Sequence, residues 1–236
     1  MKKIAIISDI HCHLFLFEKA LEDIKKRGID EFVFLGDYIS DGPNGDKIIN
    51  IVKALSQNVV YGNREYDMAN YDGVVWEGNP RYRNKLFTYN ELSDENKSYI
   101  KKLPIYKIIQ VDDKKICFSH GTPYQVDGQV LANSYDLFDK LIMDFNCDIY
   151  LFGHQHRPFC VEYRKKLFIN PGSINTPLDG KATSKYGILT INDDVTYELV
   201  EYAYSFEVVK NYYVESDYFQ ACLAWANLLI YALRDG

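Results

Sequence analysis

The sequence predicts an α/β protein in which two mixed β-sheets pack together as one domain, with helices on the outside. In the first half, short apolar runs alternate with segments of helical periodicity, which is typical of parallel strands joined by helical crossovers. In the second half, short apolar runs follow one another between turn residues, which indicates mostly antiparallel strands. With 236 residues and 47% hydrophobic composition, the chain is long enough to bury a large core.

The first half supplies the parallel strands. Strands are expected at 3–8, 31–37 and 58–63, each a short run rich in Ile, Val or Phe. Apolar residues recur at helical spacing from Leu14 to Ile24, and Gly28 follows as a helix stop. A second helix is expected at about 46–55. Residues 64–103 have few long apolar runs, so we expect a helical or irregular insertion there.

The second half supplies the remaining strands and one helix. Strands are expected at 106–111, 114–121, 148–154, 160–163, 167–169, 186–191 and 196–202, and a helix at 134–145. The tail at 218–234 is apolar on nearly every face, so we expect a helix buried against the domain or at an oligomer interface. We therefore divide the chain into a domain at 1–205 and a C-terminal helical segment at 206–236.

Composition limits the class of partner. The net charge of −6 argues against stable nucleic-acid binding and against attachment to an anionic membrane. No run of about 18 apolar residues is present, so no transmembrane helix is expected. The five cysteines are widely spaced and form no C-x-x-C pair, which favours free thiols and a cytoplasmic location.

Five predicted strand ends share one pattern: an apolar run, a small residue, and then a side chain able to bind a metal. These side chains are Asp9, His11, Asp37, Asn63, His120, His154 and His156. The carboxyl ends of strands in α/β sheets gather the ligand site. Carboxylate, imidazole and amide groups suit Mn, Fe, Zn or Ni. Two such ions about 3.5–4 Å apart can clamp a phosphoryl group.

Each motif also has a plain structural interpretation. A Gly-Asp after a strand is often only a turn, and a histidine at a strand end often only hydrogen-bonds the backbone. Their concentration favours a metal site, because four of the five histidines lie at strand ends beside the acids and the asparagine.

The motifs occur in a familiar order. They read IAIISDIH at 4–11, LGDYISDGPN at 35–44, GN at 62–63, SHG at 119–121, GHQHRPF at 153–159 and INPGSIN at 169–175. Over about residues 2–200 the sequence resembles the calcineurin-like metallophosphoesterases, in their small bacterial and archaeal branch. The resemblance implies a four-layer α/β/β/α sandwich with a dimetal site at the strand ends.

The same resemblance implies the role of each ligand. Asp9, His11 and His156 would hold one divalent metal ion (Mn, Fe, Ni or Zn), Asn63, His120 and His154 would hold a second, and Asp37 would bridge them. The family hydrolyses phosphate monoesters or diesters, with a metal-bound hydroxide attacking phosphorus in line. The resemblance therefore implies a metal-dependent phosphoesterase acting on a small phosphorylated substrate.

Two departures from the family pattern concern candidate catalytic residues. Arg64 stands where many members have a histidine that assists the leaving group; an arginine cannot usefully donate a proton, but it can bind phosphate beside Asn63. The alternative is a solvent-facing side chain. His13, in a Cys-His pair where the branch usually has Gly-Asn, could supply the missing acid or only cover the metal rim.

Other functions share these motifs. A protein phosphatase or a dinucleoside polyphosphate hydrolase would carry the same ligands. A non-catalytic protein that binds a phosphate ligand would explain Arg64, but it would have little reason to keep seven metal ligands. The apolar tail adds the expectation of a homo-oligomer.

Overall fold

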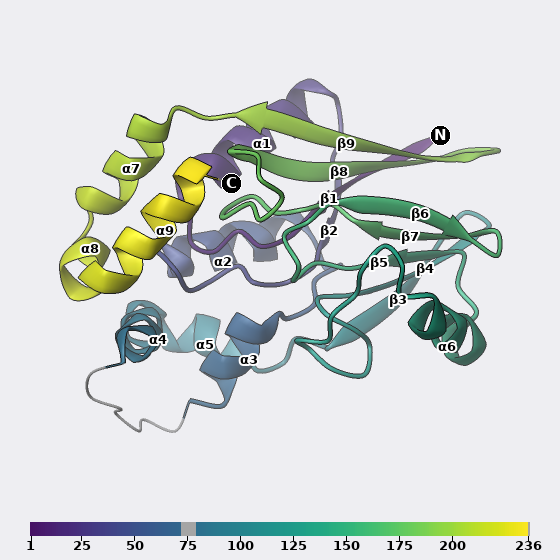
Figure 1. The fold of residues 1–236 in the computed structure, drawn as a ribbon. Helices are drawn as coiled ribbons and strands as arrows, with labels where there is room; N and C mark the ends of the chain where they lie inside the picture. The colour runs from purple at the N-terminus through teal and green to yellow at the C-terminus, as the bar shows by residue number, and fades with distance from the viewer. Residues whose placement is uncertain (72–78, 236) are drawn as a thin grey trace.

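Two β-sheets form the centre of the computed structural model, which describes residues 1–71 and 79–235 (Figure 1). The first sheet has the order β2-β1-β8-β9, from Glu31–Phe34, Lys2–Ile7, Thr183–Ile191 and Val195–Ala203. The second has the order β3-β4-β5-β7-β6, from Tyr106–Val111, Lys114–Ser119, Ile149–Leu151, Lys166–Asn170 and Phe159–Tyr163. Each sheet contains both parallel and antiparallel pairs, so both are mixed, as predicted.

Three apolar layers join the sheets and helices. Side chains such as Ile6, Phe118 and Leu189 fill the space between the two sheets. On the outer face of the first sheet lie α1 (Leu14–Lys26) and α2 (Gly45–Leu55), and on that of the second lies α6 (Tyr135–Phe145). The molecule is therefore the four-layer α/β/β/α sandwich that the sequence led us to expect.

The strand β1 shows why its sequence is a continuous apolar run. Ile4 and Ile6 pack into the layer between the sheets, whereas Ala5 and Ile7 pack against the outer helices. Successive side chains of a strand point to opposite faces, so a strand that is covered on both faces must be apolar throughout.

The prediction of a strand at 58–63 is wrong. The structure has only an isolated parallel bridge there, between Val59 and Phe34. The pairing is short because the chain turns at Gly62 into α3 (Asn63–Ala69). The insertion that follows is helical where it is described, with α4 (Pro80–Glu91) and α5 (Asp94–Ile100); residues 72–78 of it lie outside the described residues.

The apolar tail is not one helix over 218–234. Three helices, α7 (Phe206–Val214), α8 (Asp217–Ala221) and α9 (Leu223–Asp235), follow one another, with Cys222 between the last two in a non-helical conformation. They pack on the domain, at the same end of the molecule as α4 (Figure 1).

The tail is also less buried than its composition suggests. Tyr213, Ala226 and Leu233 join the large outer core, while Leu228 and Tyr231 are 59% and 57% exposed. A homo-oligomer through this side of α9 stays a prediction, as does the domain boundary at 205. In the part of the chain that the structure describes, no helix is long and apolar enough to cross a membrane.

Candidate metal centre

The strand ends bring the predicted ligand residues to one place. Asp9 and His11 lie in the loop after β1, Asp37 after β2, and Asn63 is the first residue of α3; His120 follows β4, and His154 and His156 follow β5. Backbone hydrogen bonds join the first two loops, from the Asp9 amide to the Gly36 carbonyl at 3.1 Å and from the His11 amide to the Asp37 carbonyl at 2.9 Å. The loops therefore form one continuous wall of the site.

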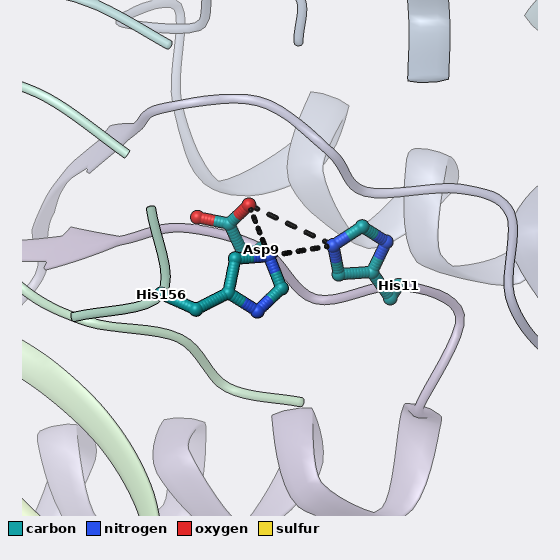
Figure 2. Close-up of side chains that lie close together, drawn as sticks. All are labelled: Asp9, His11 and His156. Atoms are coloured by element: carbon teal, nitrogen blue, oxygen red, sulfur yellow. Dashed lines mark hydrogen bonds and ion pairs between the residues drawn. The ribbon is translucent and has the colours of Figure 1, made fainter. Parts of the chain in front are cut away.

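Asp9, His11 and His156 converge on a single point (Figure 2). Asp9 Oδ1 lies 3.1 Å from His156 Nε2 and 3.6 Å from His11 Nε2, and the two Nε2 atoms are 3.2 Å apart. The other ring nitrogen of His156 lies 2.6 Å from the Thr176 carbonyl, and that of His11 lies 3.1 Å from Asp41 Oδ2. A carbonyl and a carboxylate oxygen both favour a proton on the Nδ1 that faces them, which leaves Nε2 of each ring as the atom that a metal ion could bind.

Three electron-pair donors that face one another need a cation between them. Asp9 Oδ1 is buried and accepts no hydrogen bond of good geometry from the described residues. A buried carboxylate oxygen without a donor is costly, and a bound metal ion would remove that cost. The residues present therefore fit a divalent metal.

A second group shares Asp9 and adds Asp37 and His120. Asp37 Oδ2 lies 3.4 Å from His120 Nε2 and 3.7 Å from His11 Nε2, so this carboxylate stands between the two groups. Asn63 Oδ1 is 3.1 Å from His120 Nε2, and the His154 ring lies 5.2 Å from the His120 ring. The structure thus brings all seven predicted ligands together; the metal that each binds stays a prediction.

The backbone at these positions is strained. Asp9, His11, Asp37, His154 and His156 have φ angles of 55°, 45°, 54°, 65° and 54°, in the left-handed region that such residues rarely adopt. Strain of this kind persists only where the surroundings impose it, and it gathers at functional sites.

Two glycines permit the close approach of the loops. A Cβ atom at Gly36 would lie 2.5 Å from the Gly62 nitrogen, and a Cβ atom at Gly62 would lie 2.1 Å from Asp37 Oδ1. Both distances are too short for any side chain. The Gly-Asp and Gly-Asn pairs of the sequence therefore reflect backbone packing next to a ligand.

The electrostatics of the centre favour positive charge. Burial lowers the pKa of His11, but the nearby Asp41 and Asp9 carboxylates raise it to a net value of about 10. Burial likewise lowers the pKa of His120, whereas Asp37 and Asp9 raise it to about 9. The carboxylates thus hold a cationic charge here, which either protons or metal ions can provide.

Comparison with known proteins identifies the family. The model of the calcineurin-like phosphoesterase superfamily domain matches residues 1–194. The chain belongs to the calcineurin-like phosphoesterase superfamily. It is therefore a metal-dependent phosphoesterase by family, in agreement with the two buried Asp/His groups.

Relatives of this phosphoesterase are found in archaea. A protein of Methanocaldococcus jannaschii that is named only as uncharacterized is 29% identical over 240 residues, which cover 88% of this chain and 92% of that protein. A phosphodiesterase of the same archaeon is 26% identical over 183 residues, which cover 77% of this chain and 89% of that enzyme.

Solved structures share the fold. A metallophosphoesterase from Sphaerobacter thermophilus superposes with a TM-score of 0.77 at 23% identity, covering 99% of this chain and 98% of the other. A hypothetical protein from Pyrococcus horikoshii gives a TM-score of 0.78 at 18% identity, covering 97% and 98%. Because both cover nearly the whole chain, the likeness of fold includes the C-terminal helices.

In this phosphoesterase, Arg64 points into the centre. Its backbone amide donates to Asp37 Oδ1 at 2.8 Å, its Nη2 lies 3.2 Å from Asp41 Oδ2, and its Nε lies 3.9 Å from Asp37 Oδ2. The side chain is only 15% exposed. The alternative of a solvent-facing arginine is therefore wrong, while substrate binding by Arg64 stays a prediction.

The structure places His13 differently from a proton donor. Its Nδ1 accepts a hydrogen bond from the Leu16 amide at 3.4 Å and so caps α1, and its ring stacks on Tyr212 of α7 at 4.2 Å. Burial lowers the pKa of His13 to about 3. These contacts support a structural role, and nothing in them supports the predicted catalytic one.

Two residues of the centre do not emerge from the sequence patterns. The buried Glu65 carboxylate accepts hydrogen bonds from the amides of Asp37, Tyr38 and Gly62, each at 2.8 Å, and so holds the two ligand loops together. Asp41 lies beside His11 and Arg64. The one sequence feature that could have pointed to Asp41 is its place inside the LGDYISDGPN motif.

Proposed function

We propose that the protein hydrolyses a small phosphate monoester or diester at a centre of two divalent metal ions. The observation that carries this proposal is the pair of buried Asp/His groups that share Asp9, with Asp37 between them. In this arrangement Asp9, His11 and His156 would hold one ion, Asn63, His120 and His154 would hold the other, and Asp37 would be shared by both. Such ions supply an activated water near neutral pH and neutralise phosphoryl oxygens.

The chain's own residues contribute substrate binding. Arg64 is held beside the centre by Asp37 and Asp41, with its Nε buried and without a hydrogen-bond partner among the described residues. A guanidinium in this position can donate to a phosphate oxygen through its planar fork. Asn63, at the N-terminus of α3, would orient the same phosphoryl group.

A small pocket lies next to Arg64, and its lining includes Ser40, Arg64, Met68, Thr88 and Tyr89. Its volume of about 20 Å³ is too small for a substrate group, so it does not define the substrate. The similarity to a phosphodiesterase of Methanocaldococcus jannaschii supports a diester as one candidate substrate.

The test is turnover of a panel of esters by metal-free protein after addition of Mn²⁺. The panel holds 4-nitrophenyl phosphate, bis(4-nitrophenyl) phosphate, nucleoside monophosphates, cyclic nucleotides, a phosphoprotein and a dinucleoside polyphosphate. We expect Mn²⁺-dependent release of product from at least one ester, and none from the variant Asp9→Asn. Asp113→Asn is the matched control, because Asp113 is an exposed carboxylate paired with Lys114 on the hairpin β3–β4.

A different outcome would favour a non-catalytic protein. Arg64 in place of a proton donor is the observation that favours a protein that binds phosphate ligands without turnover. Saturable binding of phosphate by the Mn²⁺-loaded protein, with no hydrolysis of any ester in the panel, would replace the proposed function by that one. Hydrolysis confined to phosphoproteins would identify a protein phosphatase, and hydrolysis confined to dinucleoside polyphosphates would identify a hydrolase of that class.

A further inference from the structure

Asp41 connects the metal centre to distant parts of the chain. Its Oδ2 lies 3.1 Å from His11 Nδ1 and 3.2 Å from Arg64 Nη2. Its Oδ1 accepts hydrogen bonds from Trp225 Nε1 at 2.8 Å and from Asn84 Nδ2 at 2.6 Å. One oxygen therefore faces the centre and the other faces α4 and α9.

Each of the three C-terminal helices directs at least one polar group toward this loop. Tyr213 of α7 donates to the backbone carbonyl of Asp41 at 3.1 Å. Tyr218 of α8 donates to Asn84 Oδ1 at 2.7 Å, and Asn84 in turn donates to Asp41. Trp225 of α9 donates to the carboxylate itself. These donors come from three separate helices of an apolar segment, yet they converge on one residue.

We propose that Asp41 is a positioning residue for the metal centre, and that the helices α7–α9 hold it in place through Trp225, Tyr218 and Tyr213. The Oδ2 of Asp41 lies 3.1 Å from His11 Nδ1, and its negative charge favours a proton on that nitrogen, which leaves Nε2 as the metal-binding atom of the ring. The same oxygen holds the guanidinium of Arg64 over the centre. This inference rests on the proposed metal site.

The geometry explains why Asp41 needs these helices. A carboxylate rotates about its Cα–Cβ bond unless both oxygens have fixed partners, and a group that orients a metal ligand must itself be locked. Trp225 and Asn84 lock Oδ1, which sets the direction of Oδ2. If Trp225 loses its N–H group, one of the two side chains that orient the carboxylate from outside the loop is lost.

The experiment measures Mn²⁺ affinity by titration calorimetry on metal-free protein. Trp225→Phe removes the indole N–H group but keeps an aromatic ring, and Asp41→Asn removes the charge. Tyr204→Phe is the control, because the Tyr204 hydroxyl ties the same segment together through the Leu233 carbonyl at 2.8 Å without reaching Asp41. The melting temperature of each metal-free variant reports its stability separately.

We expect Asp41→Asn to weaken Mn²⁺ binding about 10- to 100-fold, as loss of an outer-sphere partner usually does. Trp225→Phe should weaken it about three- to tenfold, and Tyr204→Phe should leave it within about twofold. If Trp225→Phe binds Mn²⁺ as Tyr204→Phe does, the helices only stabilise the fold and this inference is wrong. Because Trp225→Phe keeps the ring, that comparison stands even where Asp41→Asn does not fold. A wild-type protein that binds no Mn²⁺ would instead overturn the proposed function.

Discussion

The strand-end loops and the C-terminal helices meet at one site, but they hold their side chains by different means. In the loops, left-handed backbone at Asp9, His11 and Asp37 aims short side chains inward, and backbone hydrogen bonds fix the loops to one another. In the helices, ordinary packing buries Tyr213 and Leu233, and the polar tips of long aromatic side chains reach the loops. The loops thus set where the ligands are, and the helices set how one supporting residue is turned.

This difference predicts different tolerance to change. A loop ligand is surrounded by groups that all depend on it, so its loss affects charge, metal binding and backbone strain together. A helix side chain at the same site contributes one hydrogen bond, and its loss should be felt only through Asp41. The losses of Mn²⁺ affinity and activity caused by substitutions in the two regions should therefore differ by orders of magnitude.

The largest effect is expected for Asp37→Asn. Asp37 lies between His11 and His120 and also accepts the backbone amide of Arg64, so the variant loses the carboxylate that both metals would share. Phosphoesterase activity should fall by more than about 100-fold, beyond the usual effect of an outer-sphere partner. Elemental analysis of Mn²⁺-reconstituted protein should show fewer than the two ions per chain expected for wild type. Full activity in this variant would show that the ligand assignment is wrong.

Arg64 comes next, because it acts through substrate rather than metal. Loss of a charge-assisted phosphate contact worth about 1.5–3 kcal/mol should raise KM roughly ten- to a hundredfold in Arg64→Ala. Effects on kcat should be smaller with a nitrophenyl ester, whose leaving group needs no proton. The metal content should not change.

Arg64→His tests whether a histidine at this position can protonate the leaving group. A well-placed acid contributes about 10²–10⁴-fold, so this variant should gain more on alkyl or ribose phosphates than on nitrophenyl esters. If both Arg64 variants keep the kinetics of every ester within about twofold, Arg64 does not contact the substrate.

The same contrast explains how much the sequence could predict. The ligands were found because each follows a short apolar run within a few residues, and such runs end at one edge of the sheets. The two-sheet arrangement followed from strand order in the same way. The strand prediction failed just before Asn63 and Glu65. Only one bridge forms there before the chain turns at Gly62 into α3.

The rest could not be predicted because it depends on contacts across the whole chain. Trp225 lies 184 positions from Asp41, and no local pattern pairs them. The tail appeared uniformly apolar, and the sequence could not show that its tyrosine and tryptophan polar groups point at a loop while Leu228 and Tyr231 face outward. His13 was a candidate acid because it lies two residues from His11 along the chain. In the structure it caps α1, and its ring stacks on Tyr212 of α7.

An effect of pH is expected on metal binding. In the metal-free protein burial lowers the pKa of His11 and of His120, but the carboxylates raise these values to about 10 and about 9. Both rings are therefore positively charged imidazolium groups at neutral pH. Metal binding must displace such protons, so Mn²⁺ affinity should rise with pH from 6 to 8, by up to about tenfold per pH unit for each proton released. Calorimetry in two buffers of different ionisation enthalpy counts these protons. An affinity independent of pH would show that the rings are already neutral.

The smallest effect on catalysis is expected at His13, which lies where the two regions touch. It follows the first ligand loop, caps α1 and stacks on Tyr212 of α7. A general acid must be protonated near the working pH, and burial instead lowers the pKa of His13 to about 3, so the ring stays neutral. His13→Ala should therefore change kcat by less than about threefold on every ester. The free energy of unfolding should fall by about 0.5–2 kcal/mol, the usual cost of removing an N-cap. His13→Asn keeps a capping oxygen and should recover much of that loss, which separates capping from ring stacking in thermal unfolding of the metal-free protein. The opposite result would be a fall in kcat of about a hundredfold or more on alkyl phosphates, with nitrophenyl esters and stability unaffected. That result would identify His13 as the proton donor and contradict its purely structural role.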